Sequence, residues 1–286
     1  IFDKIWIQPA AGDAGGALGA ALALWHIEFN KKRIVNPKDD MKGSYLGPEY
    51  SQIEIEKNLN ILGAKYEVLT EDKIIDFTAK DLSEGKAVGW FQGRMEFGPR
   101  ALGSRSILGD ARSPTMQKAL NLKVKYRESF RPFAPSVLRE DVSTWFNLNT
   151  DSPYMLLVSN VNNDKIFKMT DDEKRLFGIE KLNVKRSEIP AVTHVDYSAR
   201  IQTVNKDTNP KYFKLISSFK EKTGCPVIVN TSFNIRGEPI VNTPKDAFTC
   251  FMGTDLDILI VGNCYLEKKK QEVKINKSYI NKYELD

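Results

Sequence analysis

The sequence predicts an α/β (α+β) fold. From Ser51 onward, segments with helical periodicity alternate with short apolar segments of strand length. Several of these short segments are continuously apolar, which is typical of strands covered on both faces. The chain has 286 residues, 41% hydrophobic and 28% charged, so it is long enough for one large or two ordinary domains.

The N-terminal elements are expected to be a strand, a turn and a helix. Residues 4–8 alternate in polarity, residues 9–16 are small and turn-forming, and residues 14–30 have helical character. The N-terminus of such a helix can hold an anion or a nucleotide ribose. Residues 31–50 are polar and without sustained period, so we expect a linker and the first domain boundary there.

Beyond the linker, the pattern predicts alternating helices and strands. The predicted helices cover residues 52–62, 78–84, 210–222 and 244–252, and the predicted strands cover residues 66–69, 87–92, 154–159, 200–204, 226–230 and 256–261. The charged segment 162–187 is expected to be a mobile flap. The tail from Lys268, rich in lysine and asparagine, is expected to be disordered or a surface extension.

Composition argues against several classes of protein. The chain has no run of eighteen apolar residues and no visible signal peptide, so we expect a soluble protein without a membrane span. Cys225, Cys250 and Cys264 lack CxxC spacing, which argues against disulfides and favours a reducing cytoplasm with all three thiols buried. Because Ile1 replaces an initiator methionine, we expect the chain to begin inside a longer polypeptide.

Positive charge is concentrated in one part of the chain. The formal net charge is only +5, but residues 94–139 contain ten Lys or Arg and three Asp or Glu. A concentrated positive field suits a partner that carries phosphate groups.

The first candidate motif is the stretch Gly-Arg-Met-Glu-Phe-Gly-Pro-Arg-Ala-Leu-Gly-Ser-Arg at residues 93–105. It places Arg94, Arg100 and Arg105 on a turn with three glycines. Glycines let a backbone approach a ligand closely, and guanidinium groups match phosphate oxygens bidentately. The alternative is a surface loop with ordinary ion pairs.

The second candidate motif covers residues 123–135. Lys123, Lys125 and Arg127 alternate, so they would share one face of an extended strand, and Pro132 and Pro135 exclude a helix through the segment. Such a row of cations could hold triphosphate or carboxyl groups, or follow a nucleic-acid backbone. It could equally be the solvated face of an edge strand.

The third candidate motif is a buried strand that ends in a polar turn. The turn contains Asn230, Thr231, Ser232 and Asn234. Polar groups at the carboxyl end of a strand lie where α/β folds usually bind ligands. A turn that simply caps the next element is the alternative.

Histidine is scarce. His194 lies in the stretch His-Val-Asp-Tyr-Ser-Ala-Arg with Asp196 and Arg200, and a lone histidine is more often structural than catalytic. His26 has no second ligand at a metal-binding spacing, so we assign it a packing role.

These motifs resemble the C-terminal domain of the O-carbamoyltransferase family, the nodulation protein U and cephem carbamoyltransferase type. The resemblance covers roughly residues 5–267 and rests on the arginine turn, on Phe-Arg-Pro-Phe-Ala-Pro-Ser-Val and on Asn-Thr-Ser-Phe-Asn. That domain is YrdC-like, a twisted mixed sheet with the signature Lys-x-Arg plus Ser-x-Asn. The matching residues are Lys125, Arg127, Ser232 and Asn234.

The resemblance implies a domain organisation. Residues 1–43 would be the C-terminal remnant of an actin-like transferase domain and linker, residues 44–267 the YrdC-like carbamoyl-activating domain, and residues 268–286 a polar tail. It also implies that carbamoyl phosphate and ATP, with Mg²⁺, give carbamoyl adenylate. The carbamoyl group would then pass to a hydroxyl of a sugar or secondary metabolite in the N-terminal half.

The expected site residues follow from this reaction, in which clustered cations offset the repulsion between anions. We expect catalytic roles for Arg100, Lys125, Arg131 and Arg200, nucleotide binding by Arg94, Arg105, Arg127, Asn230, Thr231, Ser232 and Asn234, and substrate binding by His194 and Asp196. Ser232 is not assigned as a nucleophile because no base lies beside it in the sequence.

Asp13 matches the metal-binding aspartate of the family's Gly-Asp-x-Gly turn, for a transition metal such as iron. The histidine pair that should complete this site is absent, and Tyr197 stands where family members commonly have glycine.

A non-catalytic nucleotide- or RNA-binding YrdC-like module is the main alternative to the enzyme, and a scaffold that has lost the activation chemistry is the third. We expect small-molecule substrates, no membrane, no nucleic-acid partner and a homodimer as one possible assembly. The sequence identifies neither the acceptor nor the metal, and it leaves open whether this chain is active alone.

Overall fold

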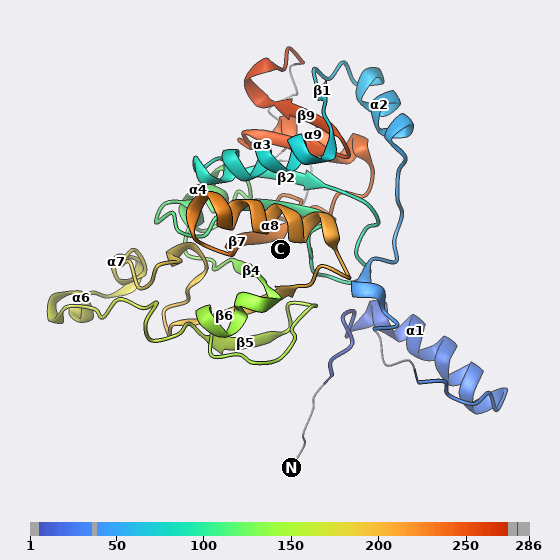
Figure 1. Ribbon diagram of the computed structural model, residues 1–286, viewed down its shortest axis with the longest axis horizontal. Coiled ribbons are helices and arrows are strands. Elements are labelled where there is room, and N and C mark those ends of the chain that lie inside the picture. The colour runs from blue at the N-terminus through green and yellow to red at the C-terminus, as the bar shows by residue number, and fades with distance from the viewer. Residues whose placement is uncertain (1–5, 36–38, 274–278, 280–286) are drawn as a thin grey trace.

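A computed structural model describes residues 6–35, 39–273 and 279. Its centre is a mixed sheet with the strand order β1-β9-β8-β2-β3-β7-β4-β6-β5, covered by helices on both faces (Figure 1). The predicted α/β class is therefore confirmed. The strands are β1 Glu67–Val68, β2 Val88–Phe91, β3 Arg105–Asp110, β4 Ala134–Leu138, β5 Leu157–Asn160, β6 Ser198–Val204, β7 Val227–Ser232, β8 Ile258–Val261 and β9 Cys264–Glu267.

Strand direction determines which loops meet. β2 is parallel to β8 and β4 is parallel to β6, whereas β3 is antiparallel to β2 and β7, and β7 is antiparallel to β4. The carboxyl ends of β2, β7 and β8 therefore lie at the same edge as the amino ends of β3, β4 and β6. We call this the cationic edge, made by residues 92–104, 124–133, 193–197 and 233–240, and the opposite end of the strands the far edge.

Helices cover both faces of the sheet, and others project from it (Figure 1). They are α1 Asp13–Ala23, α2 Gln52–Ile61, α3 Glu71–Ser83, α4 Met116–Lys123, α5 Val142–Trp145, α6 Asp171–Arg175, α7 Gly178–Leu182, α8 Pro210–Thr223 and α9 Pro244–Gly253. Tyr212 of α8 hydrogen bonds to Ser136 on β4, while Met116 of α4 packs beside Gly109 on β3. Ser136 and Gly109 point to opposite faces by the register, so α8 and α4 cover opposite faces.

Local sequence explains where these helices begin and end. Capping boxes start α2 at Ser51 and α9 at Thr243, where the side chain accepts from the N3 amide and the N3 carboxylate accepts in return. Pro210 occupies the first turn of α8, and Gly224 ends it in the left-handed conformation. The helices and strands predicted near these signals are confirmed, although α3 begins at Glu71 rather than at residue 78.

The extended strand predicted through Lys123, Lys125 and Arg127 is wrong. Lys123 is the last residue of α4, and the chain then turns with Tyr126 at φ 48°. The amide of Lys125 bonds to the carbonyl of Leu120, so the three cations do not share a strand face. Alternation of charge resembled a strand because the true element is a short helix followed by a tight turn.

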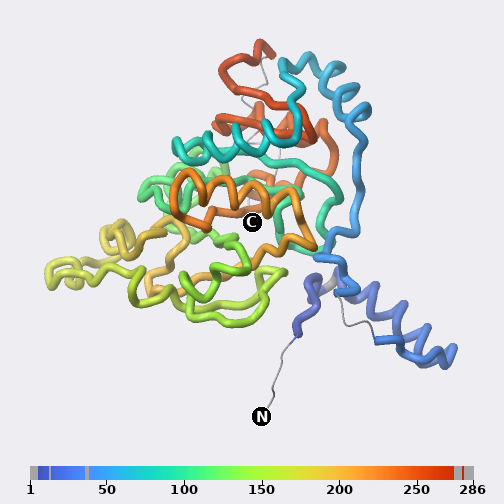
Figure 2. Tube along the Cα trace, in the orientation of Figure 1, coloured from blue at the N-terminus to red at the C-terminus, as the bar shows by residue number. Residues whose placement is uncertain are grey.

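The N-terminal helix projects from the body (Figures 1 and 2). α1 continues into a π-helical turn at Leu24–Glu28, close to the predicted extent, with exposed apolar residues such as Trp25, Ile27 and Phe29. His26 contacts the carbonyl of Lys31 rather than packing in a core. The predicted strand at 4–8 falls partly outside the described residues, and an actin-like origin of this segment stays a prediction.

Part of the predicted linker is attached to the arginine turn. Gly47 donates to the carbonyl of Met95, Met95 donates to the carbonyl of Pro48, and Phe97 donates to the carbonyl of Ser44. These bonds pair residues 44–48 with residues 95–97, so the end of the linker supports the cationic edge.

The remaining expectations concern the flap, the tail and the cysteines. The segment 162–187 carries the short helices α6 and α7, which extend away from the sheet (Figure 1). Most of the predicted tail lies outside the described residues, but Tyr279 is buried. Cys225, Cys250 and Cys264 are free and buried as predicted. Within the described ranges, every helix is too short or too polar to cross a membrane.

Candidate active site

Lys125 occupies the centre of the cationic edge. Its side chain is 3% exposed, and Nζ donates to the carbonyl of Ser232, to Ser232 Oγ at 3.2 Å, to Asn234 O at 2.9 Å and to Asn234 Oδ1 at 2.7 Å. Ser232 Oγ also donates to Asn234 Oδ1 at 2.7 Å. The structure thus brings the Lys-x-Arg lysine and the Ser-x-Asn pair, which are far apart in sequence, into one cluster.

The ammonium of Lys125 is held by neutral oxygens. Among the described residues, it forms no ion pair. Burial, and then the positive charge of Arg127, lower the pKa of Lys125 to about 7. Four acceptors around Nζ act in the other direction, because a neutral amine has too few N–H groups to satisfy them. A bound anion would strengthen the ammonium form.

Arg127 and Arg131 flank this lysine. Arg127 Nε donates to Asn121 Oδ1 at 2.6 Å, its guanidinium lies 5.0 Å from the Phe133 ring centre, and burial lowers its pKa to about 10. Arg131 is more exposed and pairs with Glu128 at 3.0 Å, a carboxylate that it shares with Arg236. Arg131 therefore needs to leave a surface partner before it can bind a ligand.

Arg100 and Arg200 form the second cationic group. Burial, and then the positive charge of Arg100, lower the pKa of Arg200 to about 10, so the two guanidinium groups are near neighbours. Both Nε atoms are buried without a hydrogen-bond acceptor, and the one side-chain hydrogen bond of Arg200 to the described residues goes to the sulfur of Met155 at 3.9 Å. Within the described chain neither arginine pairs with a carboxylate.

A polar network holds Arg100 close to β7. Asn230 Nδ2 donates to the carbonyl of Ala101 at 3.1 Å and to Gln202 Oε1 at 2.8 Å. Gln202 in turn donates to the carbonyl of Leu102 at 2.8 Å. Asn230 and Ser232 point to the same face of the sheet, whereas Thr231 points to the other face. Gln202, two residues after Arg200 on the same strand face, was not singled out from the sequence.

Arg105 and Arg94 have different positions from the other arginines. Arg105 is fully buried, lies 3.5 Å from the centre of the Phe91 ring, and donates to the carbonyls of Gln92, Gly93, Ser104 and Pro48. Burial lowers its pKa to about 10. Arg94 is exposed and donates to the carbonyl of Gly47. These contacts tie the arginine turn to the linker, and they leave little of Arg105 for a ligand.

Glu96 is a residue of this turn that the sequence analysis passed over. One carboxylate oxygen accepts from the amides of Leu102 at 2.7 Å and Ser104 at 2.8 Å, while Oε2 is buried without a partner. Burial raises the pKa of Glu96. The sequence signal that could have identified it is a single carboxylate among the arginines and glycines of this turn. A carboxylate that is buried there persists only where its hydrogen bonds organise the backbone.

Two glycines let the turn approach its neighbours. A Cβ on Gly103, which has φ 106°, would lie 2.3 Å from the Tyr212 ring, and one on Gly98, which has φ 125°, would lie 3.0 Å from the carbonyl oxygen of Pro9. The arginine turn is therefore in direct contact with the segment that leads into Asp13.

His194 and Asp196 belong to a tight turn. Ser198 Oγ donates to Asp196 Oδ1 at 2.7 Å and contacts His194 Nδ1 at 3.1 Å. Burial lowers the pKa of His194, so this imidazole is neutral at pH 7. Tyr197, where the resemblance leads us to expect glycine, has φ 63°, a left-handed conformation that glycine adopts without strain.

The metal prediction is not tested by these residues. Asp13 begins α1, but its side chain lies outside what the structure describes. In the described part of the chain, no three His, Cys, Asp or Glu side chains cluster to hold a metal ion.

Comparison with known proteins gives a family. Residues 79–268 match the family model described as the carbamoyltransferase C-terminus. The chain is 54% identical over its full length to an uncharacterized protein of Synechocystis sp., covering 47% of that protein. It is 42% identical to nodulation protein NolNO of Sinorhizobium fredii over 94% of this chain and 37% of that protein. It is 31% identical to the 3'-hydroxymethylcephem-O-carbamoyltransferase of Streptomyces clavuligerus over 93% of this chain and 44% of that enzyme.

The chain thus spans less than half the length of these relatives, and its matched region contains all four loops of the cationic edge. Both the domain match and the named relatives lead to one conclusion: the chain belongs to the carbamoyltransferase family and contains its C-terminal region.

Proposed function

We propose that the cationic edge binds ATP and carbamoyl phosphate and forms carbamoyl adenylate. In this reaction a carbamoyl oxygen becomes bonded to the α-phosphorus of ATP, and pyrophosphate leaves. The phosphate of carbamoyl phosphate leaves as inorganic phosphate, with water supplying its oxygen. The carbamoyl group then passes to a hydroxyl of an acceptor such as a sugar or secondary metabolite, bound by the remainder of the longer protein.

One observation carries the proposal: buried or half-buried cations at the same edge have no carboxylate partner among the described residues. Besides Arg127, three such cations are Arg100, Lys125 and Arg200. Burying an unpaired cation costs free energy, so such a group is retained where an anionic ligand completes it. Two phosphate-bearing substrates supply enough negative charge for all three.

The two cationic groups suggest separate roles. Arg100 and Arg200 lie near each other at the cationic edge, and two guanidinium groups suit the phosphate of carbamoyl phosphate. Lys125 is a single ammonium held by Ser232 and Asn234, which suits the α-phosphate region, where charge builds up as pyrophosphate leaves. Arg127 and Arg131 would bind the departing phosphates, while Asn230 and Asn234 orient the nucleotide through neutral hydrogen bonds.

We expect Mg²⁺ with the ATP, because a divalent cation would offset the negative charge of the phosphate groups. Asp13 would contribute a carboxylate to a transition-metal site whose other ligands come from outside this chain. The acceptor hydroxyl would be activated at that site. The contact of Gly98 with Pro9 places the arginine turn next to the segment that ends at Asp13, so the two steps would take place near one another.

The test is carbamoyl-phosphate-dependent release of pyrophosphate from ATP by the purified chain. Lys125→Ala should abolish it, a loss of at least roughly 100-fold for an ammonium that interacts with the transition state. Lys220→Ala is the control, because it removes an ammonium that is paired with Asp141 instead. Tight ATP binding without any release by the wild-type chain would favour a binding module, or activation that needs the rest of the protein.

A further inference from the structure

Tyr279 lies in the C-terminal segment, beyond the residues that match the family model, yet its side chain is only 6% exposed. Its ring packs on Gly253 at the end of α9, where an added Cβ would lie 2.3 Å from the ring. Its hydroxyl donates to Glu238 Oε1. Packing therefore fixes the ring, and a hydrogen bond fixes the hydroxyl.

Glu238 connects this tyrosine to the lysine cluster. Glu238 is 9% exposed, its Oε2 accepts from the amide of Ile235 at 2.9 Å, and its carbonyl accepts from Asn234 Nδ2 at 2.6 Å. Because Nδ2 of Asn234 is used in this way, Oδ1 faces Lys125 Nζ at 2.7 Å. Residues 234–238 thus form a turn that fixes the orientation of the asparagine amide toward Lys125.

We infer that Tyr279 is a positioning residue for Lys125, acting through the Glu238 carboxylate and the Asn234 amide. The inference rests on the proposed function for the role of Lys125, but not for the geometry. A neutral hydroxyl can hold the Glu238 carboxylate in place without cancelling its charge. The Lys125 ammonium then stays near the negative charge of Glu238 without forming an ion pair with it.

Loss of the hydroxyl should change this arrangement. The Glu238 carboxylate, which also interacts with Cys250, would lose the hydrogen bond that restrains Oε1 and could move toward the Lys125 ammonium. The charged or titratable groups that face Lys125 are Arg127, Cys250 and Glu238, and Glu238 is the only carboxylate in that set. A closer carboxylate would raise the pKa of Lys125 and compete with phosphate groups for its charge.

The variant Tyr279→Phe in the full chain tests the inference, with Tyr265→Phe as a matched control. Tyr265 also donates from a buried hydroxyl to a carboxylate, Asp81 Oδ2 at 2.7 Å. The pH titration of the Lys125 ¹³Cε resonance, assigned by its loss in Lys125→Met, should move upward by roughly one unit in Tyr279→Phe and stay unchanged in Tyr265→Phe. The KM for ATP should rise roughly tenfold with little change in kcat.

An unchanged Lys125 titration in folded Tyr279→Phe would overturn the inference. If that variant does not fold, Glu238→Gln tests the inference instead, because it keeps an acceptor for Tyr279 but removes the negative charge. The Lys125 titration should then move downward, and an unchanged midpoint would again contradict the inference. Since the titration needs no turnover, a chain that releases no pyrophosphate would count against the proposed function of this chain alone and would leave the positioning role intact.

Discussion

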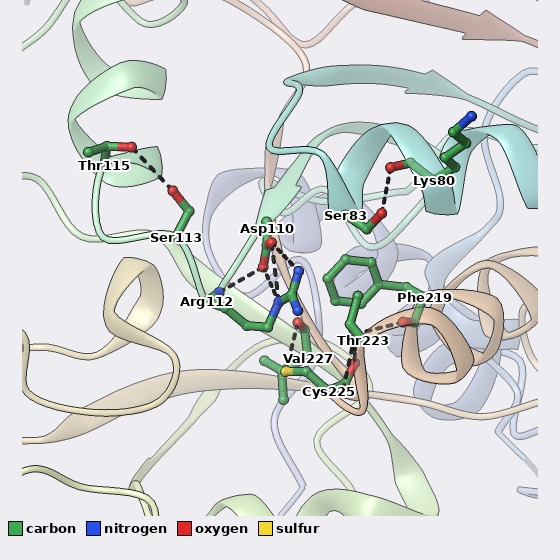
Figure 3. Close-up of polar contacts among 10 residues, drawn as sticks. All are labelled: Lys80, Ser83, Asp110, Arg112, Ser113, Thr115, Phe219, Thr223, Cys225 and Val227. Atoms are coloured by element: carbon green, nitrogen blue, oxygen red, sulfur yellow. Dashed lines mark hydrogen bonds and ion pairs between the residues drawn. The ribbon is translucent and has the colours of Figure 1, made fainter.

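The two edges of the sheet carry arginines in opposite electrostatic settings. At the far edge, where β3 ends, Arg112 forms a bidentate pair with Asp110, Nε to Oδ1 at 3.0 Å and one terminal nitrogen to Oδ2 at 2.7 Å. Its guanidinium lies 5.3 Å from the Phe219 ring centre (Figure 3). At the cationic edge, Arg100 and Arg200 lie beside each other without such a partner.

The difference separates cations that stabilise the fold from cations available to a ligand. Other lysines away from the cationic edge are also neutralised, as in Lys86 with Asp81 at 2.6 Å and Lys220 with Asp141 at 2.8 Å. Composition alone does not distinguish these groups, because arginines at both edges contribute equally to the net charge. Arg105 and Arg186 are also buried without a carboxylate, but backbone carbonyls accept from them. Arg100 and Arg200 have neither a carboxylate nor a carbonyl acceptor among the described residues, and this distinguishes them as candidates for ligand binding.

The largest effect should come from removing the unpaired arginines. Arg100→Met and Arg200→Met should each lower kcat/KM for pyrophosphate release by roughly 100-fold, since a charge-assisted hydrogen bond to a phosphate contributes up to about 3 kcal/mol. Neither change should lower the free energy of unfolding, because replacing either arginine removes the repulsion between two like charges. Steady-state kinetics and urea titration measure the two quantities. A variant that loses stability but keeps wild-type kinetics would show that its arginine stabilises the fold instead of binding a ligand.

The paired arginine should behave in the opposite way. Arg112→Met leaves Asp110, 5% exposed, without its guanidinium, so the free energy of unfolding should fall by about 2–3 kcal/mol. The KM for ATP should not change. The double variant Asp110→Asn/Arg112→Met should recover part of the lost stability, because a neutral amide is less costly to bury than an unpaired carboxylate. A kinetic defect in folded Arg112→Met would contradict the division between the edges.

A smaller effect on kcat/KM is expected when the contact that supports the arginine turn is disturbed. Gly98→Ala places a Cβ 3.0 Å from the Pro9 carbonyl oxygen at φ 125°, which should shift the turn and lower kcat/KM by roughly tenfold. Gly85→Ala is the matched control, because it also has positive φ but faces open space. Equal kinetic losses in both variants would show that strain alone, not contact with residue 9, causes the defect.

The sequence was sufficient for the fold class and for most elements with clear periodicity or caps. The polar turn after β7 and the arginine turn were each identified from the sequence, and both follow strands that run in the same direction. β3 and β4 were missed because their residues belong to motifs dominated by glycine, arginine and proline. Propensity gave no strand signal there, and pairing with β7 determines the extended conformation.

Within the site, residue type could be predicted but residue environment could not. Arg94, Arg100 and Arg105 lie on one turn with similar sequence surroundings, yet the structure uses Arg105 to bind carbonyl groups and leaves Arg100 unpaired. Likewise Lys125 was expected on one face of an extended strand, and it is instead buried in a tight turn. Long-range contacts with residues 48, 92 and 232–234 decide these environments, and spacing along the chain carries no information about them.

The smallest expected effect is the uptake of a fraction of a proton when ATP binds. Burial lowers the pKa of Lys125 to about 7, so much of this side chain is neutral at pH 8 in the free protein. A bound phosphate group favours the ammonium and raises that pKa, so ATP binding at pH 8 should take up part of a proton, and less at pH 6, where the ammonium already predominates. Calorimetry in two buffers of different ionisation enthalpy measures this uptake, and Lys125→Met should remove it. If wild-type protein binds ATP without proton uptake, the four oxygens around Nζ keep Lys125 protonated before the ligand binds. The cationic edge would then be preorganised for ATP, and ATP binding would not change the charge of Lys125.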